Sequence, residues 1–86
     1  MLNVNYSKLI NEVILFADEC DFSDVRNRHM VIGQIKLLQA ALQTLPLVGH
    51  TFDQAIDACN YATTAVLAND YEDVFACLTN LDTLTK

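Results

Sequence analysis

The sequence has little of what ends or bends a helix, since only two of its 86 residues are glycine and one is proline. These residue types are the strongest breakers of regular structure, so their scarcity favours long elements joined by short turns. Tryptophan is absent, and no apolar run approaches the roughly 20 residues that a membrane-spanning helix needs. We therefore expect no membrane-spanning segment.

Positive charge is also scarce. Five lysines and arginines face eleven aspartates and glutamates, which gives a formal net charge of −6. Binding to a nucleic-acid backbone depends on lysine and arginine displacing counterions, and an anionic membrane surface repels an acidic protein. We therefore expect no direct contact with nucleic acid or with a membrane.

Three cysteines, Cys20, Cys59 and Cys77, cannot all pair within one chain. Each lies in an apolar helical context, where a reduced cysteine behaves as a small hydrophobic residue. The first residues, Met1 to Asn5, show no basic segment before an apolar stretch, so we expect no secretory signal. The sequence thus predicts a reducing compartment and a cytoplasmic location.

Apolar side chains, by contrast, are abundant, at 52% of the residues. This content predicts a folded chain, and the length leaves room for a single helical domain over residues 1–86. It also exceeds what a monomer of this size readily buries. The surplus favours either a homodimer or binding to another protein.

The apolar residues recur with helical spacing almost throughout. This pattern predicts an all-α fold, a small antiparallel bundle of about four helices with one long central helix. The predicted helices run from Tyr6 to Cys20, from Ser23 to Leu45, from Phe52 to Ala68, and from Asp70 towards Lys86.

Polar residues suited to helix capping precede these segments. Asn5, Ser23 and Asp70 are the expected N-caps of the first, second and fourth helices. The spacing of Thr51 and Gln54 matches a capping box and predicts the start of the third helix. Asn69 tolerates the left-handed conformation that often follows a helix.

Gly33, inside the second helix, lowers helix stability by about 1 kcal/mol relative to alanine, which we interpret as the mark of a close helix crossing.

The helical spacing also predicts which residues are buried. The expected core positions are Tyr6, Leu9, Val13 and Phe16; Val31, Ile35, Leu38, Leu42 and Leu45; Ala55, Cys59 and Ala62; and Val74, Phe75, Leu78 and Leu81.

The sequence contains no motif that points to catalysis. The acidic residues from Asp18 to Asp24 lack the glycine and the closing glutamate of a calcium-binding loop. The cysteines and histidines lack the paired spacing of a zinc site, and no glycine-rich phosphate loop occurs. We expect no catalytic residue, no metal and no cofactor, and hence no enzyme.

One residue allows a specific chemical hypothesis. His29 precedes Gly33 by one helical turn. This pair resembles the active helix of histidine-phosphotransfer bundles, in which a lysine three residues after the histidine steadies the phosphoryl group. Ile32 occupies that position here. The resemblance implies a phosphotransfer domain that uses His29, with the steadying cation missing.

The leading hypothesis is a small non-enzymatic adaptor, chaperone or inhibitor that binds a partner protein through an apolar helix face. An alternative is an acidic inhibitor of the phage anti-defence type, which blocks a basic nucleic-acid-binding channel in a host protein complex. The predicted contact residues are Arg26, Arg28, His29, Leu47, Val48, His50, Phe52, Asp70, Glu72 and Asp73.

Overall fold

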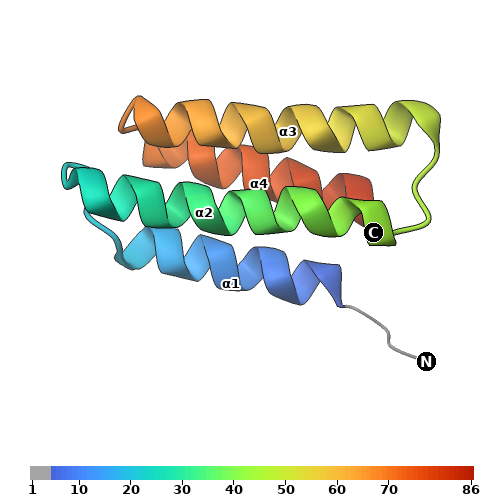
Figure 1. The fold of residues 1–86 in the computed structure, drawn as a ribbon, viewed down its shortest axis with the longest axis horizontal. Coiled ribbons are helices and arrows are strands. Elements are labelled where there is room, and N and C mark those ends of the chain that lie inside the picture. Colours follow the sequence, from blue (N-terminus) through green and yellow to red (C-terminus); the bar gives the residue numbers. More distant parts are fainter. Residues whose placement is uncertain (1–4) are drawn as a thin grey trace.

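The computed structural model describes residues 5–86, which form an all-α bundle without strands (Figure 1). Its helices are α1 (Tyr6–Glu19), α2 (Val25–Ala41), α3 (Gly49–Leu67) and α4 (Tyr71–Thr85). A 3₁₀ turn, Leu42–Thr44, extends α2. Residues 1–4, which make up most of the segment used above to judge a secretory signal, lie outside this described part.

Successive helices run antiparallel. The α1–α2 and α3–α4 connections lie at one end of the bundle, and the α2–α3 connection and the C-terminus lie at the other (Figure 1). α1 and α3 each pack against both α2 and α4, so the four helices close around one core. The predicted small antiparallel bundle is confirmed. Within residues 5–86 no helix is long and apolar enough to cross a membrane.

Two of the predicted helix starts are confirmed. The Asn5 side chain accepts a hydrogen bond from the Lys8 backbone N–H at 3.0 Å. The Asp70 carboxylate accepts one from the Asp73 N–H at 3.2 Å. Between α3 and α4, Asn69 adopts a left-handed φ of 58°. Local side-chain chemistry therefore defines the start of α1 and the tight α3–α4 turn.

The predicted cap of the second helix is wrong by one residue. Asp24 is the N-cap, and its carboxylate accepts from the Arg26 N–H at 2.9 Å. Ser23 instead donates its backbone N–H and its hydroxyl to Asp21 Oδ1, at 2.9 and 2.7 Å. Because the Asp21 carboxylate engages both donors, Ser23 belongs to the preceding turn.

The third helix begins earlier than predicted. Its first residue is Gly49, and Val48 precedes it without a capping side chain, so the capping box at Thr51 is wrong. Gly49 has a φ of +45°, a conformation that residues with a Cβ rarely adopt. The glycine lets the chain enter the helix directly after the extended Val48.

The buried seam of α2 and the small residues of α3 are confirmed. Val31, Ile35, Leu38 and Leu42 are buried, and Leu45 is half-buried. Ala55, Cys59 and Ala62 are fully buried in α3, which packs against both α2 and α4. The structure thus agrees with the heptad-like spacing of α2.

The stripe of α1 differs from the prediction. Ile10 and Ala17 join Tyr6 and Val13 in the core, whereas Leu9 and Phe16 are only half-buried. The spacing fitted both sets, and packing against α2 and α4 selects the set that faces the bundle centre. The Tyr6 hydroxyl then donates to the Leu38 carbonyl oxygen at 2.5 Å and links α1 to α2.

Phe75 is the other exception among the predicted core residues. Val74, Leu78 and Leu81 are fully buried, but Phe75 is 47% exposed. Its ring packs against Tyr71, with centroids 6.3 Å apart, and Tyr71 contacts Phe22 edge to face at 6.1 Å. This aromatic row covers the end of the bundle that holds the α1–α2 loop.

Candidate protein-interaction surface

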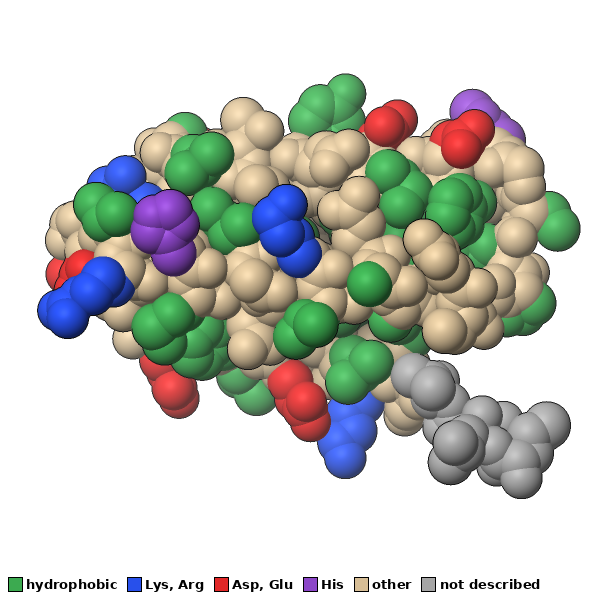
Figure 2. Space-filling model, in the orientation of Figure 1, with side chains coloured by type: hydrophobic (Ala, Val, Ile, Leu, Met, Phe, Trp, Pro, Cys, Tyr) green, Lys and Arg blue, Asp and Glu red, His purple; other side chains and the backbone are tan. Residues whose placement is uncertain are grey.

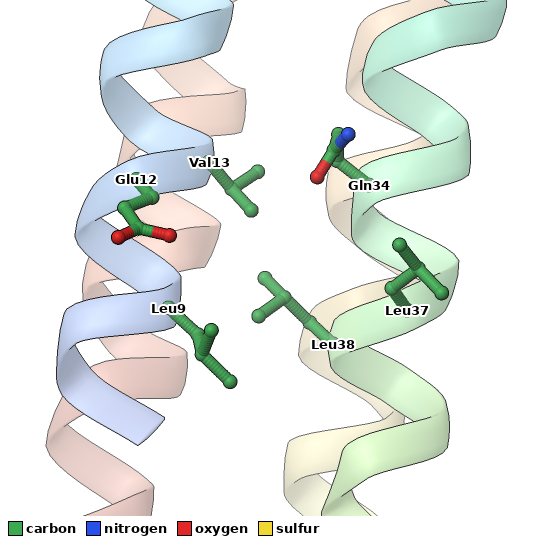
Figure 3. A pocket seen from close by; sticks show the side chains of 6 residues that line it. All are labelled: Leu9, Glu12, Val13, Gln34, Leu37 and Leu38. Atoms are coloured by element: carbon green, nitrogen blue, oxygen red, sulfur yellow. The ribbon is translucent and has the colours of Figure 1, made fainter. Parts of the chain in front are cut away.

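A groove runs between α1 and α2, with a cavity volume of about 110 Å³. In Figure 3, Val13 and Leu38 point towards each other between the two helices. Both side chains are buried, while Glu12 and Gln34 place polar groups at its exposed rim. The lining residues are Leu9, Glu12, Val13, Gln34, Leu37 and Leu38. The groove therefore has an apolar floor and one acidic side chain at its edge.

Large apolar side chains extend this groove over the surface. Leu37, on its rim, is 66% exposed, and Met30, seven residues earlier on the same side of α2, is 52% exposed. On α1, Leu15 follows Glu12 by three residues and is 63% exposed. We call this surface the α1/α2 face. It consists of four groove residues, Leu9, Glu12, Gln34 and Leu37, and of the exposed residues that helical spacing places on the same sides of the two helices, Leu15, Glu19, Arg26 and Met30. Exposed apolar residues beside a groove make this surface the candidate for interaction with a partner.

Most of these residues were absent from the predicted contacts. Met30 and Leu37 lie beside the seam that runs through Val31 and Leu38, and neither was among the predicted contact residues. The one usable signal was their seven-residue spacing, because it places two large apolar side chains on one line outside the buried stripe.

The two helices of the α1/α2 face differ in charge. Between Val25 and Ala41, α2 has three basic residues and no carboxylate. α1 has one lysine and three acidic residues, Glu12, Asp18 and Glu19. Figure 2 shows Lys, Arg and His side chains along α2, with acidic side chains nearer the margins of the view. The two helices therefore carry opposite net charge.

The three predicted contacts near the start of α2, Arg26, Arg28 and His29, have different surroundings. Arg28 is half-buried, and its Nε donates a hydrogen bond to the Phe22 carbonyl oxygen, which holds the α1–α2 loop. The Arg26 side chain is 90% exposed, with its Nε 3.8 Å from Asp24. An exposed pair of this kind contributes little to stability. His29 is exposed, so Arg26 and His29 are accessible to a partner.

The predicted contacts around the α2–α3 connection lie at the opposite end of the bundle. Val48 is 78% exposed and His50 is exposed, whereas Leu47 and Phe52 are half-buried against the core. α2 has 17 residues, so about 25 Å separates this group from the arginines. The structure does not bring the two groups together.

The predicted acidic contacts lie at the end that holds the arginines. Asp70 is occupied as the cap of α4, and Glu72 and Asp73 are exposed in its first turn. The α1–α2 loop, with Asp21 and the end of α1, lies at the same end (Figure 1). Carboxylates from two separate parts of the chain therefore gather there.

His29 and Gly33 are both exposed on α2, while Ile32 is half-buried. A Cβ built on Gly33 would meet no atom within 4 Å, so the predicted close helix crossing is wrong. The glycine lies on the solvent side of the helix, where no neighbouring helix approaches it. The phosphotransfer hypothesis stays a prediction, and His29→Gln in a phosphorylation assay tests it.

The three cysteines are free thiols. Burial raises the pKa of Cys59 from 9.0 to about 11, and it is also the main cause of the raised pKa values of Cys20 and Cys77. A raised thiol pKa lowers the thiolate fraction at neutral pH and with it the reactivity. Within residues 5–86, no three His, Cys, Asp or Glu side chains gather as metal ligands.

Comparison with known proteins returns no match: no family model, no curated protein and no solved structure is significantly similar to this chain. The class that the fold defines is a small antiparallel four-helix bundle over residues 5–86. Its surface is therefore the feature from which a function can be inferred.

Proposed function

We propose that the protein is a small non-enzymatic interaction module that binds a protein through the α1/α2 face. The observation that carries this proposal is the exposure of Leu37 on the rim of one apolar groove, together with the exposure of Leu15 and Met30 on the two helices that form it. Burying apolar surface contributes about 25 cal/mol per Å², so covering these side chains gives a partner a substantial driving force. Polar contacts with Glu12 and Gln34, on the rim of the groove, orient the bound partner.

The proposal is tested by the single change Leu37→Glu. This substitution places a charge at the groove mouth, where a bound protein would have to desolvate it. Leu37 is exposed in the isolated chain, so the bundle should keep its helix content and its thermal midpoint. We expect binding through this face to weaken at least tenfold, the range of an interface hot spot.

A matched control is Leu67→Glu. Leu67 is also an exposed leucine, 57% accessible, but it lies at the end of α3, away from the α1/α2 face. Both variants and the unaltered protein, each tagged, are compared by crosslinking in extract followed by mass spectrometry. Crosslinks lost with Leu37→Glu and kept with Leu67→Glu support the proposal. Equal recovery from all three proteins contradicts it.

A second candidate is the acidic inhibitor of a basic nucleic-acid-binding channel. It is favoured by the carboxylates of the α1–α2 loop and of the first turn of α4 at one end of the bundle. Reversing Glu72 and Asp73 to lysine should then abolish inhibition and its salt dependence. Reversing Asp53 and Asp57, exposed carboxylates of α3, makes the same change in net charge at another place and serves as the control.

A further inference from the structure

A second groove lies between α3 and α4, the two helices that do not take part in the α1/α2 face. Its cavity volume is about 250 Å³. We call it the α3/α4 groove, and its lining residues are Gln54, Asp57, Ala58, Tyr61, Asn80 and Leu84. Ala58 is buried and Leu84 is half-buried, whereas the other four residues are exposed. The groove therefore has a small apolar floor and a polar rim.

A carboxylate and an aromatic ring share this rim. Asp57 and Tyr61 are four residues apart on α3, so they lie one turn apart on the same side of the helix. Tyr61 is 66% exposed. The ion pairs among residues 5–86, Arg26 with Asp24 and Lys86 with Asp82, do not include Asp57. Its carboxylate is therefore open to a cation from outside the chain.

The charge around the α3/α4 groove has one sign. Residues 49–85 contain no lysine or arginine, and they contain six carboxylates, Asp53, Asp57, Asp70, Glu72, Asp73 and Asp82. Lys86 follows directly, but it does not line the groove, and its Nζ lies 3.6 Å from the Asp82 carboxylate. The groove therefore attracts a cation and repels an anion.

The size and the lining of the groove favour an arginine side chain. The cavity is smaller than the roughly 300–1,000 Å³ of small-molecule sites, so it holds one side chain rather than a whole ligand. The aliphatic stem of arginine packs on Ala58 and Leu84. Its flat guanidinium stacks on the Tyr61 ring and donates to the Asp57 carboxylate and the Asn80 amide oxygen. A lysine ammonium has neither the flat surface nor the forked donors.

We propose that the α3/α4 groove binds an arginine side chain that belongs to a basic segment of another protein. The rest of the segment lies outside the groove, because the cavity admits one side chain. The α1/α2 face is formed by other helices, so this site goes beyond the proposed function and does not depend on it. It also differs from the surface of the acidic inhibitor, since Glu72 and Asp73 do not line the groove.

The test is an NMR titration of the whole ¹⁵N-labelled chain with a blocked tripeptide, glycine–arginine–glycine. The ionic strength is about 0.15 M, at which exposed charges more than about 8 Å apart are largely screened. Peptide is added to about 10 mM, which is enough to measure a Kd near 1 mM. We expect saturable shifts of the backbone amide signals of residues 54–61 and 80–84.

Two altered peptides test the chemistry of recognition. Citrulline in place of arginine keeps the shape of the side chain and removes its charge, so binding should weaken about tenfold through loss of the ion pair and of the cation–π contact. Lysine keeps the charge and removes the fork, so its peptide should bind more weakly than the arginine peptide.

Three variants of the chain test the location. Asp57→Asn should weaken binding of the arginine peptide about threefold to fivefold, the value of an exposed ion pair. Tyr61→Leu should weaken it about twofold to fivefold, the value of an exposed cation–π contact. The matched control is Asp53→Asn, because Asp53 is an exposed aspartate one turn earlier on α3 that does not line the groove. It makes the same change in net charge and should leave the Kd unchanged.

Shifts that spread over all the acidic residues without saturation would show attraction by net charge alone and would overturn the site. Equal binding of the citrulline peptide, or equal effects of Asp57→Asn and Asp53→Asn, would also overturn it. Free arginine carries its own carboxylate, which the groove repels, and should bind more weakly than the peptide. If it binds as tightly, the occupant is a free amino acid and the proposed protein segment is wrong.

Discussion

The Tyr6 hydroxyl is the polar group that links α1 to α2, and its removal should measurably weaken the bundle. Tyr6 is 4% exposed, and its hydroxyl donates to the Leu38 carbonyl oxygen at 2.5 Å. In Tyr6→Phe that carbonyl, inside α2, keeps its helical partner, so no buried acceptor is left unsatisfied. The expected loss is therefore the net value of one hydrogen bond, about 1 kcal/mol. The whole protein has a free energy of unfolding of roughly 4–13 kcal/mol, so the loss is resolvable.

The same substitution should change the alkaline limb of the stability profile. Burial is the main cause that raises the pKa of Tyr6 above its ordinary value of 10.0, and the nearby Cys59 contributes less. The folded state then binds the phenolic proton more tightly than the unfolded chain does. The stabilisation is complete below about pH 10 and is lost as the pH rises further, by up to about 1.4 kcal/mol per pH unit. Tyr6→Phe removes this component.

Urea unfolding followed by circular dichroism, at pH 7 and in steps from pH 9 to 11, measures both effects. Tyr61→Phe is the matched control, because Tyr61 is 66% exposed. We expect a loss of about 1 kcal/mol and a shallower alkaline decline for Tyr6→Phe, and less than about 0.5 kcal/mol for Tyr61→Phe. Identical profiles for the two variants would refute the role assigned to the Tyr6 hydroxyl.

Three further predictions concern packing. Gly33→Ala should stabilise the monomer by about 0.5–1 kcal/mol, since the added Cβ meets no atom and alanine is the better helix former; destabilisation in thermal unfolding would show that the site is crowded. Leu78→Ala should cost about 2–5 kcal/mol, because Leu78 is fully buried between helices, and a cost below 1 kcal/mol in urea unfolding would contradict that packing. Cys59, fully buried with a pKa raised to about 11, should react with iodoacetamide only when the bundle opens, whereas Cys20 and Cys77 are half-buried and should react sooner; mass spectrometry of timed samples would expose the reverse order.

Prediction from the sequence was most accurate where one residue and its near neighbours decide the structure. Asn5, Asn69 and Asp70 mark helix boundaries through their own side chains or backbone preference, and all three were identified. The N-cap of α2 was assigned one residue too early, to Ser23 instead of Asp24. Both residues are polar and adjacent, and only the hydrogen bond from Ser23 to Asp21 shows that Ser23 belongs to the preceding turn. The capping box predicted at Thr51 is wrong because α3 has already begun at Gly49. The positive φ of this glycine lets the chain enter the helix without a capping side chain.

The candidate site was predicted less well than the fold. Arg28 was predicted as a surface contact, but its Nε donates a hydrogen bond to the Phe22 carbonyl oxygen. The Asp70 carboxylate, also a predicted contact, accepts from the Asp73 N–H as the N-cap of α4. The apolar residues of the α1/α2 face were assigned to packing or left out. A charged or apolar residue type alone does not tell whether its partner lies in the same chain or outside it.

The helical character of this protein, and about where each helix begins and ends, follow from its amino-acid sequence, because helical spacing and capping act within a few residues. The sequence also determines the buried seam of α2, which a single helical period describes. The packing of the four helices makes Ile10 rather than Leu9 face the core, leaves Gly33 open to solvent and places Leu37 beside a groove. The physical reason is that periodicity orients a side chain about its own helix axis, whereas burial depends on which neighbouring helices stand on that side.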